Sequence, residues 1–163
     1  MEDNIKSLLE FVTEAGNIDH VVFTAGDAVN PYGLDVVKAE DIPTIGTVRV
    51  TASIMLAKHL SKYMNQSTNS SFTLTGGGMA WRPSPGWSTF ASVLGSVESL
   101  ARGLAIDLKL IRVNCAIPEA IHTEIFDWVP SEHLRLPCNR CGTTTSCTRS
   151  ARLRKWLRCT CSL

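Results

Sequence analysis

Apolar residues recur along this chain in patterns that alternate between helical and strand-like spacing. The first pattern predicts an amphipathic helix over residues 4–15, with Asp3 as its cap and Gly16 as its stop. Residues 18–24 form a short apolar run rich in β-branched side chains, which is typical of a buried strand in a parallel sheet. The chain is therefore expected to begin with a helix followed by a buried strand.

Two longer helical patterns and two further strands follow. Residues 40–64 have a broad apolar face at helical spacing, and residues 71–75 read as a strand. Residues 90–108 show the clearest periodicity of the chain, with an apolar side chain at every third or fourth position. Residues 110–117 are predicted to form the last strand, which ends at Pro118.

This alternation of helices and strands predicts an α/β fold built from βαβ units around a mostly parallel sheet. In such a sheet the carboxyl ends of the strands meet at one edge, where ligands bind. The segments expected at this edge are residues 24–26, 75–78 and 118–123.

Four of these segments carry recognisable strings. Residues 21–26 read Val-Val-Phe-Thr-Ala-Gly, and residues 73–78 read Thr-Leu-Thr-Gly-Gly-Gly. Residues 90–108 form the long helix, and residues 111–123 contain Arg-Val-Asn, a proline and a threonine. In this order and spacing they resemble the Asn-Ala-Gly, catalytic-serine, Tyr-x-x-x-Lys and Pro-Gly-x-x-x-Thr segments of the short-chain dehydrogenase/reductase (SDR) family, over about residues 4–127.

The resemblance implies an incomplete Rossmann-like, doubly wound parallel sheet whose first βαβ unit and glycine loop are missing. That loop cradles the cofactor pyrophosphate on a helix N-terminus, and residues 1–40 contain no such glycine-rich run. The cofactor implied by the family is NADP, and the substrate is a small molecule. The cofactor contacts carried over from the family are Thr24, Ala25, Gly26, Thr75, Pro118 and Thr123.

The catalytic residues of the family have no intact counterparts in this sequence. Alignment of the long helix places Phe90 at the position of the tyrosine general acid and Leu94 at the position of the lysine. Neither side chain can transfer a proton or carry a charge. The serine position falls within residues 76–78, so the resemblance implies that hydride-transfer chemistry is lost as the chain is written.

Arg49 and Arg82 are the candidate substitutes, because a guanidinium offers fixed, paired donors to an anionic substrate or a cofactor phosphate. Each also has a simpler interpretation. Arg49 fits a surface charge or an intersubunit ion pair on its helix, and Arg82 fits a solvated loop arginine that stacks on Trp81.

Three strings, Thr-Ala-Gly-Asp at residues 24–27, Gly-Thr-Val-Arg at 46–49 and Trp-Arg-Pro-x-Pro-x-Trp at 81–87, resemble a divergent branch of the family from fungal natural-product pathways. The resemblance implies an NAD(P)-dependent oxidoreductase of secondary-metabolite biosynthesis. Two alternatives stay open. One is a non-catalytic partner or scaffold that forms a homo- or hetero-oligomer through residues 90–108, and the other is a non-redox cyclase that uses Arg49 or Arg82.

Composition adds limits on location and partners. The chain has 163 residues and 44% hydrophobic content, which suits a single core. It has no apolar run long enough for a membrane span and no signal-like start, so a cytoplasmic protein without a membrane partner is expected.

The last 33 residues differ in kind from the rest. Residues 1–130 hold 9 basic and 14 acidic side chains, whereas residues 131–163 hold 7 basic and 1 acidic, together with five of the six cysteines. This break predicts a boundary near Pro130 between a partial SDR domain and an aberrant tail. With Trp156 as its single interleaved aromatic side chain, the tail does not indicate nucleic-acid binding.

The tail cysteines admit two interpretations. Cys138, Cys141, Cys159 and Cys161 could supply four thiolates to zinc. Alternatively, the tail is out of frame, since reading the codons of residues 148–161 two nucleotides later permits a string resembling the family's Gly-x-Pro-Glu-x-Val-Ala helix. We favour the frame shift and assign no metal ligand.

Overall fold

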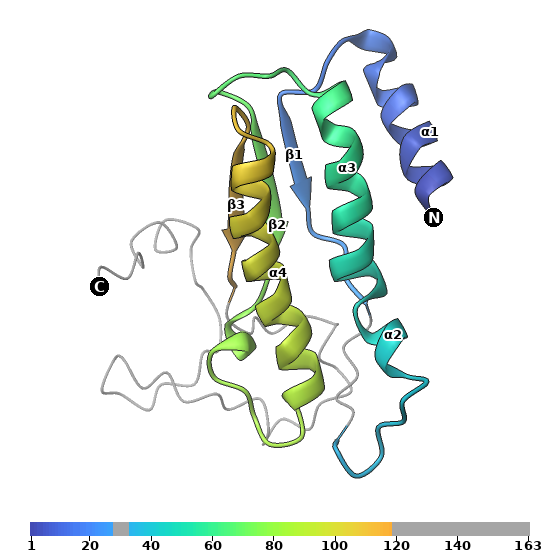
Figure 1. Ribbon diagram of the computed structural model, residues 1–163, viewed down its shortest axis with the longest axis vertical. Helices are drawn as coiled ribbons and strands as arrows, with labels where there is room; N and C mark the ends of the chain where they lie inside the picture. Colours follow the sequence, from blue (N-terminus) through green and yellow to red (C-terminus); the bar gives the residue numbers. More distant parts are fainter. Residues whose placement is uncertain (28–32, 119–163) are drawn as a thin grey trace, which may run out of the picture. The chain divides into compact units, whose positions relative to one another are not determined.

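A three-stranded parallel sheet forms one layer of the described chain, and α3 (Ser53–Tyr63) and α4 (Ser88–Asp107) lie in front of it in Figure 1. The computed structural model describes residues 1–27 and 33–118. The strands are β1 (His20–Phe23), β2 (Ser71–Thr75) and β3 (Arg112–Ala116), and they lie in the order β1-β2-β3. The predicted α/β fold with a parallel sheet is therefore confirmed.

Helices connect the strands in the predicted sequence of elements. The first expected helix is found, although its α-helical part ends earlier and Asp3 lies inside its first turn rather than capping it. Gly16 ends this segment with a φ of 135°, a left-handed conformation that favours glycine. The helical elements are α1 (Glu2–Val12), a 3₁₀ turn (Thr13–Ala15), α2 (Ile42–Ile45), a π-helix (Thr47–Ala52), α3 (Ser53–Tyr63), a 3₁₀ turn (Gly78–Ala80) and α4 (Ser88–Asp107).

The helix predicted over residues 40–64 is broken at Gly46. The short α2 precedes Gly46 and the π-helix follows it, with the carbonyl of Gly46 accepting the N–H groups of Val50 at 2.9 Å and Thr51 at 3.2 Å. The second of these bonds spans five residues, which defines the π-turn. The wider turn rotates the side chains that precede α3 relative to those of a regular helix.

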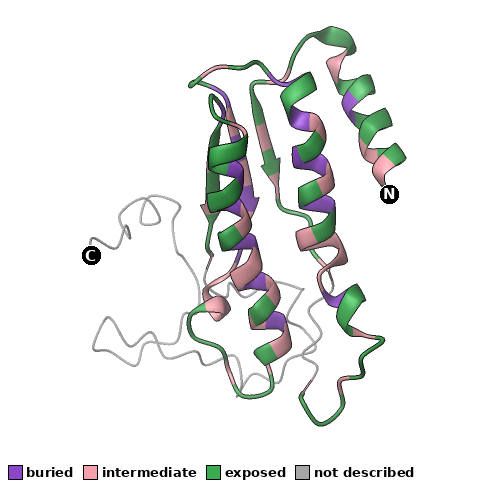
Figure 2. Cartoon of the chain, viewed as in Figure 1, coloured by how far each residue is buried: buried purple, intermediate pink, exposed green. Residues whose placement is uncertain are grey.

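The core lies between the sheet and α1, α3 and α4 (Figure 2). Phe72 and Leu74 project from the central strand and have no exposed surface. They pack with Leu60 of α3 and Val97 of α4, and Leu9 of α1 joins the same cluster. The apolar positions of α4 thus serve the core of this chain, as the helical periodicity predicted.

The expectation that the first strand is buried is wrong. Val21 and Phe23 pack against the core, but Val22 points to the opposite face of β1 and is 65% exposed. The same alternation leaves Arg112 and Asn114 of β3 exposed. Within the described residues the helices pack on one face of the sheet, so alternate strand residues remain uncovered.

Other expectations concern parts of the chain with no described structure. The boundary near residue 130, the cysteine-rich tail and Thr123 lie outside the described residues. The described elements all fall within one compact unit, Met1–Glu119. In that part of the chain no helix has both the length and the apolar character needed to cross a bilayer.

Candidate functional site

The carboxyl ends of the three strands place several candidate residues along one edge of the sheet. Thr24, Ala25 and Gly26 directly follow β1, and Thr75 is the last residue of β2. The parallel register pairs Phe23 with Leu74 and Thr75 with Ala116, so these ends are level with one another.

Backbone hydrogen bonds connect the turn after β2 to the end of β3. Gly76 N–H donates to the carbonyl of Ala116 at 2.9 Å, and Gly78 N–H donates to the carbonyl of Pro118 at 3.0 Å. Pro118 therefore lies beside the turn that occupies the family's serine position. Thr123, the remaining candidate cofactor contact, is not among the described residues.

Arg49 reaches this edge from the π-helix. Its guanidinium carbon lies 5.7 Å from the ring centroid of Phe90. It also lies against Gly26, because a Cβ atom added there would come within 2.4 Å of the guanidinium carbon and of Nη2. Arg49 is therefore more than a solvated surface charge, since its side chain lies half-buried between a glycine and an aromatic ring.

The carboxylate of Asp27 organises the backbone that carries Arg49. Its Oδ1 accepts the N–H of Val48 at 2.9 Å, and its Oδ2 accepts the N–H of Arg49 at 3.2 Å. Burial lowers the pKa of the Arg49 guanidinium, while the negative charge of Asp27 acts in the opposite direction. Sequence reasoning quoted Asp27 within a motif but gave it no role.

The guanidinium of Arg49 retains unused hydrogen-bonding capacity. Its Nε is buried and has no hydrogen-bond partner among the described residues. A buried donor without an acceptor is costly, by about 1–3 kcal/mol. The arrangement is chemically suited to an anionic oxygen, or to a carbonyl oxygen on which negative charge develops.

Phe90 and Leu94 occupy packing positions on α4. Their side chains are 5% and 3% exposed. Phe90 meets Trp87 edge to face at 5.9 Å between ring centroids, and Leu94 lies against Gly77, where an added Cβ would be 3.1 Å from its Cδ1. Both residues contribute apolar contacts, and neither has a group that titrates.

Arg82, the second candidate arginine, lies in an exposed loop. Its backbone N–H donates to the carbonyl of Gly78 at 3.2 Å, and the described residues include no cation–π contact between Arg82 and Trp81. Trp81 instead donates its indole N–H to the buried carboxylate of Glu98 at 2.6 Å. Periodicity alone did not identify Glu98, because a charged residue on the buried face of α4 departs from the pattern.

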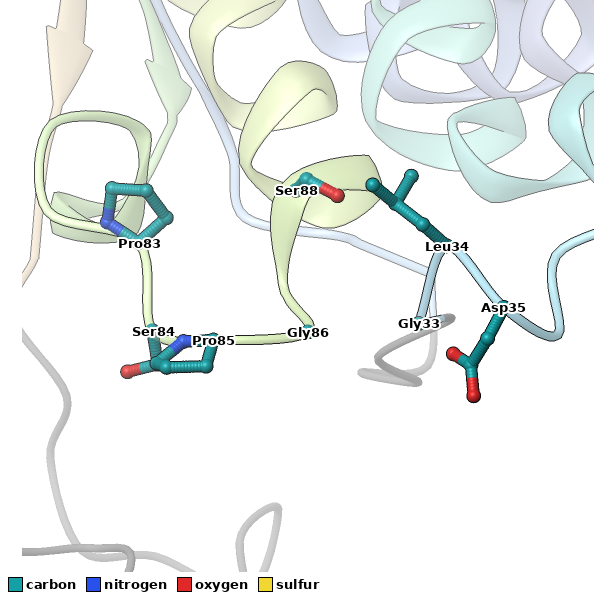
Figure 3. A pocket seen from close by; sticks show the side chains of 8 residues that line it. All are labelled: Gly33, Leu34, Asp35, Pro83, Ser84, Pro85, Gly86 and Ser88. Carbon is teal, nitrogen blue, oxygen red and sulfur yellow. The ribbon is translucent and has the colours of Figure 1, made fainter.

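A pocket of about 580 Å³ lies between the segment that precedes α2 and the loop that leads into α4 (Figure 3). Leu34 and Asp35 line it on one side, and Pro83 and Pro85 line it on the other. The pocket is shallow and largely open to solvent, so it does not enclose a ligand by itself. The sequence alone could not show that these two segments face each other.

The described residues contain no group of three or more His, Cys, Asp or Glu side chains placed to hold a metal ion. The four cysteines considered as zinc ligands lie in the tail, outside the described part of the chain.

Comparison with known proteins identifies the family. A profile described as an SDR-like Rossmann domain matches residues 1–136. The short-chain dehydrogenase/reductase ucsE of an Acremonium species is 44% identical over 135 residues, which cover 82% of this chain and 51% of that protein. The short-chain dehydrogenase/reductase malC of Malbranchea aurantiaca is 38% identical over 152 residues, covering 93% and 58%.

Solved structures agree with these similarities. The structure of the MalC reductase/Diels-Alderase from Malbranchea aurantiaca is 40% identical, with a TM-score of 0.75 over 82% of this chain and 53% of that one. A short-chain dehydrogenase from Burkholderia cenocepacia in complex with NADP is 26% identical, with a TM-score of 0.72 over 83% and 56%. The chain spans about half the length of these relatives, and its fold is the corresponding part of a Rossmann-like sheet. The chain belongs to the short-chain dehydrogenase/reductase family.

Proposed function

We propose that this protein derives from NADP-linked oxidoreductases of fungal secondary metabolism, and that it binds the cofactor or a small molecule through Arg49 without the conventional hydride transfer of its family. The fungal relatives and the NADP complex of a related dehydrogenase support this proposal. The observation that carries it is the Arg49 guanidinium, partly buried at the edge of the sheet with an unpaired Nε.

The residues present are compatible with part of an NADP site. Thr24, Ala25, Gly26, Thr75 and Pro118 lie at the sheet edge where the family contacts its cofactor, and Thr123 is assigned there by resemblance alone. When bound, NADPH supplies a hydride. In this proposal Arg49 holds an anionic group of the cofactor or an oxygen of the substrate, and its charge would stabilise negative charge that develops there.

The family's usual acid–base step needs a tyrosine and a lysine, and this sequence has Phe90 and Leu94 at those two positions. Phe90 and Leu94 are apolar and lie inside the packed face of α4, so no proton can move through them. We propose that the chain as written is inactive in conventional hydride transfer. Turnover of NADPH by the purified chain, with a carbonyl substrate, would contradict this statement.

A titration with NADPH tests the proposed role of Arg49. Cofactor fluorescence is followed for the wild-type chain, for Arg49→Met and for Arg82→Met, with Arg102→Met as the control because Arg102 is exposed on α4. Arg49→Met should weaken binding by about tenfold, which corresponds to the loss of one hydrogen bond to a charged group. Equal affinities for the wild type and Arg49→Met would refute the contact.

Non-redox cyclisation is the second candidate. The similar MalC structure is described as a reductase/Diels-Alderase, and a shallow, open pocket lies beside α4. Such a reaction is accelerated when the reacting ends of the substrate are held in a fixed orientation, and it has no need of a tyrosine acid. Substrate cyclisation that is lost in Arg49→Met but is unaffected by omission of NADPH would favour this alternative.

A further inference from the structure

Asp27 and Arg49 come from different segments and meet beside the edge of the sheet. Asp27 follows β1, and Arg49 lies 22 residues later in the π-helix. The carboxylate uses both of its oxygens on consecutive N–H groups, those of Val48 and Arg49. These donors belong to the first turn of the π-helix, where no side-chain cap from Gly46 is available.

We propose that Asp27 is a positioning residue that holds the Arg49 guanidinium in place for its ligand. This inference rests on the function proposed for Arg49. The carboxylate fixes the backbone of the residue that carries the guanidinium, and its charge attracts that group across a partly buried space.

The adjacent glycine makes the placement specific. Gly26 immediately precedes Asp27, and its missing side chain leaves the space that the guanidinium occupies. One short segment therefore supplies both the space for Arg49 and the anchor of its backbone. The Phe90 ring limits the guanidinium on another side. If Asp27 served only as a helix cap, the residue before it would not also have to leave space for the Arg49 guanidinium.

Chemical labelling tests the inference without a substrate. Phenylglyoxal reacts with accessible guanidinium groups, and mass spectrometry reports the extent of reaction at Arg49 relative to exposed Arg102. In the wild type we expect Arg49 to react more slowly than Arg102. In Asp27→Asn, which preserves the shape of the side chain but loses its charge, that protection should be lost. Asp27→Glu should restore part of it, because the charge is retained.

Asp41→Asn is the matched control. Asp41 is half-buried and accepts the backbone N–H of Lys38 at 3.0 Å in an exposed hydrogen bond, so its replacement removes a carboxylate from a neighbouring segment without touching Arg49. Its labelling pattern should equal that of the wild type. If Asp27→Asn does not fold, Asp27→Glu provides a weaker form of the comparison: its added methylene displaces the oxygens from the two N–H groups while the charge is kept, so the protection of Arg49 should fall below that of the wild type without being lost.

The outcomes separate this inference from the proposed function. Unchanged protection of Arg49 in the folded Asp27 variants would overturn the inference and leave Asp27 as a helix cap. Lost protection together with NADPH binding weakened by about tenfold supports both statements. Lost protection with unchanged NADPH affinity supports the positioning role and refutes Arg49 as a cofactor contact.

Discussion

At the scale of single residues, the candidate site depends on contacts between segments that are distant in the sequence. Arg49 lies on a helical stretch whose pattern also fits a surface position, and its burial results from Gly26 and Phe90. No local pattern encodes that arrangement. The sequence could therefore nominate Arg49 by its chemistry, whereas its environment required the tertiary structure.

Replacement of Gly26 by alanine should displace Arg49 without unfolding the chain. The new Cβ would lie within 2.4 Å of the guanidinium carbon, so this flexible end of the side chain has to move. We expect the free energy of unfolding to change by less than about 1 kcal/mol and the protection of Arg49 from phenylglyoxal to be lost. Gly103→Ala is the control, because an added Cβ there meets no atom within 4 Å. Retained protection in Gly26→Ala would show that the guanidinium does not need this space.

Restoration of the family's lysine at Leu94 should destabilise the fold rather than rebuild a site. Leu94 is 3% exposed and lies against Gly77, and the nearby carboxylate of Glu98 already accepts the indole N–H of Trp81. We expect Leu94→Lys to lower the free energy of unfolding by about 2 kcal/mol or more, measured by urea denaturation. Leu94→Met, which conserves volume, should cost less than about 1.5 kcal/mol. A stable Leu94→Lys protein with higher NADPH affinity would contradict this interpretation.

At the scale of secondary-structure elements, α1 is attached to α3 by both apolar and ionic contacts. Leu9 of α1 enters the core, and Glu2 accepts hydrogen bonds from Lys58 at 2.6 Å and His59 at 3.1 Å. The hydrogen bond from Lys58 lowers the pKa of the Glu2 carboxyl below its ordinary value of 4.5, with a further contribution from His59. The two helices are therefore joined more firmly when Glu2 is ionised.

This pKa shift predicts acid-sensitive attachment of α1. A carboxyl whose pKa is lower in the folded state stabilises the fold above its unfolded pKa, and that contribution disappears as the pH falls through the folded pKa. The difference in the free energy of unfolding between the wild type and Glu2→Gln should therefore be greatest near neutral pH. It should disappear in acid, at pH values below the ordinary range of carboxyl pKa values. Urea denaturation across this pH range measures the difference. Glu14→Gln is the control, because the Glu14 carboxylate forms no ion pair among the described residues. Its difference in stability from the wild type should not disappear in acid in this way.

Helix α4 illustrates how far a strong periodicity can be interpreted. The apolar repeat identified the helix and its buried face, and Val97 and Leu104 indeed lie in the core. Residues 90–108 are also the predicted oligomer interface. Since the sheet already covers their apolar face, a partner would have to meet the opposite, exposed face, where Ser99 and Gly103 lie.

At the scale of the whole molecule, the order of elements followed from hydrophobic patterning because each helix and strand has its own periodicity. The break at Gly46 and the exposure of β1 did not follow. The first depends on a backbone turn anchored by Asp27, and the second depends on what covers each face of the sheet. Neither property is local, although proline and glycine, here Pro43 and Gly46, are the residue types that most often interrupt a helix.

Exposed apolar side chains on α1 and β1 predict self-association of the isolated chain. Phe11 is 70% exposed and lies one helical turn from exposed Leu8, while Val22 is 65% exposed on the uncovered face of the sheet. Apolar groups in such positions favour contact with other chains, and an uncovered strand adds to that tendency.

The double substitution Phe11→Ser and Val22→Thr should reduce this association while leaving stability almost unchanged. Both side chains contribute little to the core because most of their surface is already in water, so we expect a change within about 0.5 kcal/mol. Sedimentation velocity over a range of concentrations measures association. Ile106→Ser provides the control, since Ile106 is 75% exposed but lies on α4, away from α1 and β1 in sequence. If the double variant associates as strongly as the wild type while Ile106→Ser does not, the exposed face of α4 is the contact surface and the assignment to α1 and β1 is wrong.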